Sequence, residues 1–287
     1  MYIRYFGLSE NPFAISPDPR YLYLSRRHQE ALAHLTFGIT QGGGFVQLTG
    51  EVGTGKTMMI RTLLERLPEN VDVALVLYPF LSVHEFLAAI CTDLRVPNTK
   101  EGDSIKVSID ALNGYLLENH ARGRRTVLII DEAQKLSHDI LEQIRLLTNL
   151  ETTKEKLLQI LLIGQPELNH LLAQQNLRQL AQRITARYAL QPLSLSETRE
   201  YIAHRLQVAG AHANFFSEGA MHWIHRASGG IPRVVNVICD RALLGAYASG
   251  KTTVQVGLAR RAAAEVGNPQ RRAWRRPALA AGVVALA

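Results

Sequence analysis

The sequence feature most directly tied to chemistry is a glycine-rich loop in which one lysine stands at a fixed spacing from the glycines. The loop consists of Gly50, Glu51, Val52, Gly53, Thr54, Gly55, Lys56 and Thr57, and it follows the apolar residues 45–48. This is the pattern G-x-x-x-x-G-K-[ST] between a strand and a helix, in which glycines let backbone N–H groups face phosphate oxygens. The pattern predicts a nucleoside triphosphate site where Lys56 contacts the β- and γ-phosphates and Thr57 ligates Mg²⁺. A glycine-rich turn with an incidental lysine is the structural alternative.

The second feature is an apolar strand that ends in two carboxylates. Residues 127–130 are Val, Leu, Ile and Ile, and Asp131 and Glu132 follow them. At the carboxyl end of a parallel strand, we expect Asp131 to hold the magnesium shell and Glu132 to orient and activate the attacking water. A carboxylate directly after the metal ligand favours hydrolysis over binding alone. The alternative is a buried strand that ends in a solvated acidic turn.

Composition and charge indicate a globular protein without an obvious nucleic-acid partner. Of the 287 residues, 47% are hydrophobic and 20% are charged, which suits one or two domains with a sizeable core. The net charge is +7, but four positive charges form one C-terminal cluster: Arg271, Arg272, Arg275 and Arg276. The remainder of the chain is close to neutral, so nucleic acid is not an expected partner. Cys91 and Cys239 lie far apart in apolar patterns and are expected to be buried thiols.

The two ends of the sequence differ in character. Residues 1–7 lack a basic segment followed by an apolar core, so we expect no secretory signal and a cytoplasmic body. At the other end, the arginine cluster and Trp274 precede the apolar residues 277–287. A membrane-spanning helix takes about 20 residues, but positive charges before an apolar run are typical of the cytoplasmic start of one. We expect 277–287 to be the start of a truncated transmembrane helix, with a floppy Ala-rich tail as the alternative.

Strands and helices are predicted to alternate over the first two thirds of the chain. The expected strands are 45–48, 71–78, 127–130 and 157–163. The expected helices are 25–39, 56–67, 83–94, 109–120, 139–150 and 169–186. Such alternation implies βαβ units and a parallel sheet.

From Leu193 onward the predicted strands stop. Ser194 and Glu197 have the spacing of a capping box and begin a predicted helix that extends to residue 208. Further helices are expected at 217–227 and 234–248, and Gly229 and Gly230 permit a tight turn between them. The fold class is therefore α/β: a parallel-sheet core with the phosphate loop, plus a small all-helical domain.

The order of these features resembles that of the AAA+ ATPases. The shared features are the phosphate loop, Asp131 and Glu132, the polar Gln165 just past the next strand, and arginines after a further helix. The resemblance implies ATP as the nucleotide and Mg²⁺ as the cofactor. It also implies that Gln165 senses the γ-phosphate and helps to place the attacking water.

Three arginines acquire expected roles from the same resemblance. Arg183 is the first candidate, and Arg187 the second, for a finger that acts on the site of a neighbouring subunit. Arg233, which opens a predicted helix, resembles the lid arginine that contacts the γ-phosphate in its own subunit. A finger acting between subunits implies self-association into a ring or dimer. A polar loop residue at position 165 and surface charges at Arg183 and Arg187 are the structural alternatives.

Narrower motifs resemble the ExeA/GspA-type ATPases of the general secretion pathway. These motifs lie at 5–8, 11–13, 17–19, 164–168 and 192–206, and the resemblance covers about residues 1–265. It implies a motor or switch that acts with a B-type inner-membrane partner in assembly or transport of an outer-membrane secretin. It also implies attachment to the bacterial inner membrane through the C-terminal segment, with the ATPase domain on the cytoplasmic face.

The predicted domains follow from these assignments. They are an N-terminal linker and first helix (1–44), an AAA+ α/β core (45–192), a helical lid (193–265), a basic juxtamembrane linker (266–276) and the start of a transmembrane helix (277–287). ATPases of DNA transposition or replication initiation and of pilus biogenesis share much of the pattern and remain alternatives. A nucleotide-gated scaffold without hydrolysis is a third class, against which Glu132 argues.

Overall fold

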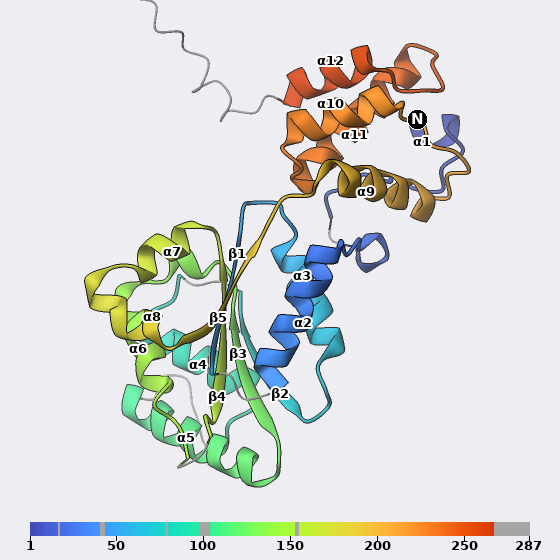
Figure 1. Ribbon diagram of the computed structural model, residues 1–287. Coiled ribbons are helices and arrows are strands. Elements are labelled where there is room, and N and C mark those ends of the chain that lie inside the picture. The colour runs from blue at the N-terminus through green and yellow to red at the C-terminus, as the bar shows by residue number, and fades with distance from the viewer. Residues whose placement is uncertain (17, 41–43, 78–79, 98–103, 153–154, 267–287) are drawn as a thin grey trace, which may run out of the picture. The chain divides into compact units, whose positions relative to one another are not determined.

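The computed structural model describes residues 1–16, 18–40, 44–77, 80–97, 104–152 and 155–266. The chain forms two compact units, one of residues 17–192 and one that combines residues 1–16 with the chain from Leu193 onward. The first unit is α/β and the second is helical (Figure 1). The expected N-terminal domain 1–44 is therefore divided between the two units, because residues 1–16 pack with the helices that follow Leu193.

The α/β unit is built on a parallel sheet. Its strands are β1 (Phe45–Gly50), β2 (Val71–Val76), β3 (Arg125–Ile130), β4 (Leu158–Gly164) and β5 (Ile184–Leu190), in the order β2-β3-β4-β1-β5. Thr49 on β1 pairs with Gly164 on β4, and Val76 on β2 pairs with Ile130 on β3. The carboxyl ends of these strands therefore share one edge of the sheet, where the predicted site residues begin.

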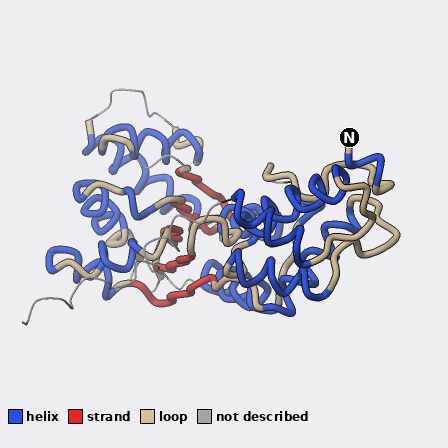
Figure 2. Tube along the Cα trace, turned by 90° about the horizontal axis from the view of Figure 1, so that it is seen from above, coloured by secondary structure: helices blue, strands red, loops and turns tan. Residues whose placement is uncertain are grey.

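Helices cover both faces of this sheet, and Figure 2 shows the strands between them. One face packs against α2 (Arg26–Thr40) and α3 (Lys56–Arg66). The other packs against α4 (Val83–Asp93), α5 (Ile105–Ala121), α6 (His138–Leu147), α7 (Glu167–Leu172) and α8 (Arg178–Gln182) (Figure 1). Short 3₁₀ turns lie at η1 (Pro19–Tyr21), η2 (Ala133–Lys135) and η3 (Gln175–Leu177). Cover on both faces explains why β1 and β4 are buried along their whole length.

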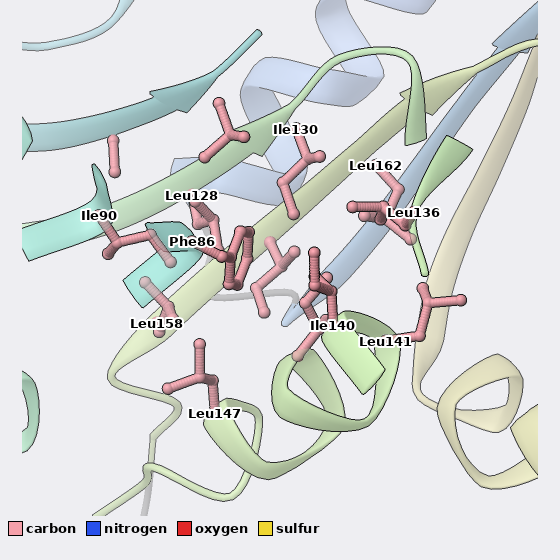
Figure 3. Close-up of a cluster of buried hydrophobic side chains, with 14 of the residues drawn as sticks. Phe86, Ile90, Leu128, Ile130, Leu136, Ile140, Leu141, Leu147, Leu158 and Leu162 are labelled. Carbon is pink, nitrogen blue, oxygen red and sulfur yellow. The ribbon is translucent and has the colours of Figure 1, made fainter. Parts of the chain in front are cut away.

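The larger apolar core lies between the sheet and helices α4 to α8, and Figure 3 shows part of it. Its labelled members are Phe86, Ile90, Leu128, Ile130, Leu136, Ile140, Leu141, Leu147, Leu158 and Leu162, and none is more than 5% exposed. Burying one such side chain fully contributes roughly 1.5–3 kcal/mol. The core thus holds β3 and β4 in place, and these two strands position the loops that follow them.

The predicted helix at 169–186 is wrong. That stretch holds α7, η3 and α8, and it ends in the first residues of β5. Along β5, Thr185, Arg187 and Ala189 are exposed while the residues between them are partly buried, which is the period of two of an edge strand. Alanine, arginine and leucine in this stretch favour helices, but pairing with β1 outweighs that local preference.

The helical unit contains α1 (Tyr2–Tyr5), α9 (Leu195–Val208), α10 (Glu218–Ser228), α11 (Pro232–Ala248) and α12 (Val256–Val266). Helix α12 was not predicted from the sequence. The predicted capping box is present: the Glu197 carboxylate accepts from the backbone N–H of Ser194 at 2.7 Å, and the Ser194 hydroxyl accepts from the Glu197 N–H. Gly230 has φ +75°, and a Cβ there would lie 2.0 Å from the carbonyl oxygen of Leu193. Only glycine fits this turn.

Buried polar contacts hold the N-terminal segment to the helical unit. Arg205 is 6% exposed and donates to the backbone carbonyls of Pro12 and Ala14. The Tyr2 hydroxyl donates to the Asp240 carboxylate at 2.5 Å, and Asn11 donates to the same oxygen at 3.2 Å. Residues 1–16 are therefore a structural part of this unit.

Within the described residues, none of the helices combines the length and apolar composition that crossing a bilayer requires. The expected transmembrane start at 277–287 lies outside the described residues, as does the expected basic linker from residue 267 onward. Both remain predictions.

Candidate nucleotide site

The phosphate loop connects β1 to α3 at the carboxyl edge of the sheet. Gly55 occupies the position before the helix with φ +105°, a conformation that L side chains rarely adopt. A Cβ on Gly50 would lie 2.8 Å from the Thr54 hydroxyl and 3.1 Å from Leu190, so glycine permits the close approach of β5 there. The backbone amides at the start of α3, together with the dipole of that helix, suit an anionic ligand.

Lys56 lies inside the curve of this loop. The side chain is 6% exposed, and its ammonium donates to the carbonyls of Gly50 at 2.8 Å and Glu51 at 3.2 Å. Burial lowers the pKa of Lys56, while the nearby carboxylates of Glu132 and Asp131 act in the opposite direction. The lysine is therefore placed where the loop and both predicted carboxylates converge.

Asp131 directly follows β3 and is 6% exposed. Burial raises its pKa, and the backbone N–H of Glu132 donates to its Oδ1 at 2.8 Å. A side-chain hydrogen bond also joins it to Thr57. A hydroxyl next to a carboxylate supplies the oxygen ligands that Mg²⁺ accepts beside substrate phosphates, so these residues fit the predicted magnesium site.

Glu132 has an unusual backbone and a well-defined set of donors. Its φ is +52°, which is rare for a non-glycine residue. Its Oε2 accepts from Gln134 at 2.8 Å and Gln165 at 3.3 Å, and the Lys135 ammonium lies 3.2 Å from the same oxygen. Burial opposes ionisation, but these three donors outweigh it and hold the pKa of Glu132 below its usual value. The carboxylate is thus ionised at neutral pH and held in one direction.

The structure brings Gln165 to Glu132, two residues that the sequence places 33 positions apart. Gln165 follows β4 and Glu132 follows β3, and these strands are neighbours in the sheet. Their proximity is consistent with the expected role of Gln165 near the attacking water. That role and the roles of the other site residues remain predictions.

Two residues in this region were not predicted as part of the site. Gln134, in η2, connects Glu132 to the residue after β4. His28, on α2, is 6% exposed and lies against the phosphate loop, with its Nε2 3.4 Å from the carbonyl oxygen of Thr54 and its Nδ1 2.7 Å from the Ser25 hydroxyl. No sequence motif marks either residue, since both contacts depend on how separate elements pack.

Comparison with known proteins adds a family to this geometry. A family model described as "AAA domain" matches residues 39–172. Those residues are therefore similar to an AAA domain. The chain is also 54% identical, over 266 residues, to "General secretion pathway protein A" of Aeromonas hydrophila. The match covers 93% of this chain and 48% of that protein, so the chain spans about half the length of this relative.

Solved structures share the fold at low sequence identity. The Aeropyrum pernix ORC2 protein matches with a TM-score of 0.65 at 19% identity, over 93% of this chain and 74% of that one. The Cdc6p protein of Pyrobaculum aerophilum matches with a TM-score of 0.67 at 20% identity, over the same shares. These likenesses support the AAA-type fold alone. The expected fold class and the resemblance to the general secretion pathway A-type ATPases are both confirmed.

The candidate finger arginines lie away from the phosphate loop of their own chain. Arg183 directly precedes β5, beside the start of β1, and donates to the Arg145 carbonyl at 3.2 Å and to the Thr148 hydroxyl. Arg187 is exposed on β5 and donates to the Ala181 carbonyl at 2.9 Å. Arg183 is thus held against the end of α6, and Arg187 is the more exposed candidate.

Arg233 belongs to the helical unit. It lies in the first turn of α11, next to Pro232, and its side chain is exposed. The local structure therefore presents this arginine on the surface at the start of a helix. Its expected contact with the γ-phosphate remains a prediction.

Proposed function

We propose that this chain binds ATP with Mg²⁺ and hydrolyses it. The observation that carries the proposal is the position of Glu132: its carboxylate is ionised, fixed by three donors and adjacent to Asp131 and the lysine of the phosphate loop. A carboxylate in this place is suited to accept a proton from an attacking water. Binding alone needs no such group.

Each residue has a distinct part in the proposed reaction. Lys56 and the loop amides bind the phosphates and offset the negative charge that develops on them. Thr57 and Asp131 would hold a magnesium ion, which would supply positive charge to neutralise the phosphate oxygens. Glu132 orients the water, and Gln165, 3.3 Å from that carboxylate, lies where it can position the same water.

We further propose that the ATPase serves a general secretion pathway. The identity of 54% to General secretion pathway protein A supports this assignment. In this proposal the chain self-associates, works with a B-type inner-membrane partner in assembly or transport of a secretin, and is attached to the inner membrane through its C-terminal segment with the ATPase on the cytoplasmic face. The nucleotide-driven change in the AAA domain would then reach the secretin through that partner.

Two variants test the enzymatic part. Glu132→Gln keeps the size of the side chain and removes its basicity, so nucleotide binding should persist while single-turnover hydrolysis falls by on the order of a hundredfold or more. Lys56→Ala should remove binding itself. Equilibrium binding of a fluorescent ATP analogue and single-turnover hydrolysis measure the two properties separately. Unchanged hydrolysis in Glu132→Gln would exclude that residue as the base.

The secretion role needs a cellular test. Cells that lack the native copy of this protein should recover outer-membrane secretin multimers with the full-length wild-type gene and not with the Glu132→Gln gene. The matched control is Gln207→Met, an exposed position on α9. Normal secretin assembly without the wild-type gene, combined with hydrolysis that DNA stimulates, would replace the secretion role with a DNA-directed one.

A further inference from the structure

Gln134 bridges the two residues that are predicted to handle the attacking water. Its Nε2 donates to Glu132 Oε2 at 2.8 Å, and its Oε1 accepts from the backbone N–H of Gln165 at 2.9 Å. Both ends of one side-chain amide are thus used, one on the carboxylate after β3 and the other on the backbone after β4. Gln165 Nε2 also donates directly to Glu132 Oε2, at 3.3 Å.

The direction of this amide is fixed by its partners. A carboxylate oxygen can only accept a hydrogen bond and a backbone N–H can only donate one, so the Gln134 oxygen must face Gln165 and the nitrogen must face Glu132. Rotating the amide by half a turn would bring two acceptors together and two donors together. The glutamine therefore recognises an ionised Glu132 and the correct loop backbone at the same time.

The last residue of β4 is a glycine, which leaves room for the Gln134 side chain. A Cβ on Gly164 would lie 2.6 Å from Gln134 Oε1 and 3.3 Å from the Gln134 backbone nitrogen. The first distance is shorter than real Cβ contacts allow. Gly164 thus leaves the space in which Gln134 crosses from one loop to the other.

We propose that Gln134 is a positioning residue that fixes the direction of the Glu132 carboxylate and couples it to the loop that carries Gln165. The proposal rests on the proposed hydrolysis and deepens it. Glu132 needs such support because its own backbone lies in the left-handed region and its donors all reach the same oxygen, Oε2. A movement of Gln165 in response to nucleotide would pass to Glu132 through this amide and through the direct contact of 3.3 Å between the two side chains.

The decisive variant is Gln134→Met, which keeps the length of the side chain and removes both hydrogen bonds. Loss of orientation should lower the single-turnover rate by on the order of tenfold to a hundredfold. The dissociation constant for the ATP analogue should change less than about twofold, because the hydrogen bonds of Gln134 go to the Glu132 carboxylate and the Gln165 backbone and not to the phosphate loop. Gln207→Met, on exposed α9, is the matched control and should match the wild type in both measurements.

A double-mutant cycle separates positioning from a general structural effect. If Gln134 acts through Glu132, then Gln134→Met should change the residual rate of Glu132→Gln by less than about twofold, since the group being positioned is no longer a base. An equal loss in both backgrounds would overturn the proposal, because Gln134 would then act independently of Glu132. Thermal melting of each variant verifies that it is folded.

A second variant approaches the same contact from β4. Gly164→Ala should displace Gln134 and give a similar loss of rate, and adding Gln134→Met to it should produce little further loss. Wild-type rates in both Gln134→Met and Gly164→Ala, with Glu132→Gln inactive, would overturn the positioning role and leave the hydrolytic function intact. Wild-type hydrolysis in Glu132→Gln would instead refute the proposed base, so the two failures are distinguishable.

Discussion

The parallel sheet has a carboxyl edge, where its strands end, and an amino edge, where they begin. Each of these edges holds a carboxylate that accepts hydrogen bonds from three residues, and the two networks differ in what surrounds them. At the carboxyl edge, Glu132 accepts from Gln134, Lys135 and Gln165 beside the phosphate loop. At the opposite edge, Asp72 near the start of β2 accepts from Arg124, from Asn119 at 2.6 Å and from Tyr115 at 3.3 Å. Asp72 thereby joins β2 to α5 and to the segment before β3. The same hydrogen-bonding chemistry serves the proposed reaction at one edge and stability at the other.

The difference follows from strand direction. In a parallel sheet every strand delivers its following loop to the carboxyl edge, so the loops after β1, β3 and β4 meet there. The amino edge receives the ends of the helices instead. Mutations at the two edges should therefore affect different measurements, and the following variants test that expectation.

The largest effect is expected from paired lysine substitutions at the two edges. Lys56→Ala should abolish ATP binding, because it removes the buried ammonium at the phosphate loop. Lys156→Ala removes the ammonium that bonds to the Thr148 carbonyl and Glu151, and it should leave the dissociation constant within about twofold of the wild type. Isothermal titration calorimetry measures the ATP dissociation constant of both variants. Tight binding by Lys56→Ala would refute the site.

The second effect concerns the arginines on and before the edge strand. A finger stabilises charge in the transition state, so its removal should reduce hydrolysis by roughly tenfold or more and leave ATP affinity nearly unchanged. Subunits with the finger removed should regain activity when mixed with Lys56→Ala subunits, which keep their fingers.

The mixing experiment also decides between the two candidates. Arg183 is the first choice from the sequence, but its contacts with Arg145 and Thr148 give it a structural use within its own chain. If Arg183→Ala lowers the melting temperature and mixing restores nothing, while Arg187→Ala is restored by mixing, Arg187 is the finger. If neither variant responds to mixing, the finger assignment is wrong.

The third effect is on stability at the amino edge. Hydrogen bonds from Arg124 and other donors hold the pKa of Asp72 below its usual value, although burial acts in the opposite direction. A lowered folded-state pKa means that the stabilisation is full above about pH 4, the usual range of aspartate, and is lost as the pH falls through the folded-state value. Asp72→Asn should therefore lower the free energy of unfolding by about 1–2 kcal/mol at pH 7 and much less near pH 3.

Urea denaturation at the two pH values measures this effect. Asp110→Asn is the matched control, because Asp110 pairs with the exposed Lys106 one turn away on α5, and it should cost less than about 0.5 kcal/mol. ATP affinity of Asp72→Asn should equal that of the wild type. A loss of ATP binding in a folded Asp72→Asn protein would contradict the separation of the two edges.

The smallest effect is expected from His28. Its ring lies between the Ser25 hydroxyl and the Thr54 carbonyl, and the second contact is long at 3.4 Å. His28→Ala should weaken ATP binding by about three- to tenfold by loosening the phosphate loop, and His28→Gln, which can still donate to the carbonyl, should restore part of the loss. Equal affinities in all three proteins would show that the loop holds its shape without His28.

Most of the carboxyl edge could be read from the sequence because its signals are local. The phosphate loop and the pair Asp131 and Glu132 are each marked by a few consecutive residues after an apolar run. The Ser194 capping box is equally local, and its predicted hydrogen bonds are present. Spacing along the sequence was sufficient to predict these features, because their backbone geometry and chemistry depend on residues that are close together in the chain.

The failures of prediction involve partners distant in the sequence. β5 became a strand because β1 pairs with it, although its residues also suit a helix. Residues 1–16 join the helical unit through Arg205 and Asp240, which lie about 200 positions away or more. The missed helix α12 packs its buried Ala259 and Ala262 into the same unit, and small residues of this kind give a weak periodic signal.

The sequence by itself determined the phosphate loop, the acidic strand end and the alternation that implies a parallel sheet, because these depend on residue type and on spacing along the chain. The tertiary structure decided which loops meet. Packing of β3 beside β4 brings Gln165 to Glu132, places Gln134 between them, and leaves room for that contact only because residue 164 is glycine. Those contacts arise from strand order and side-chain volume, which no local spacing encodes.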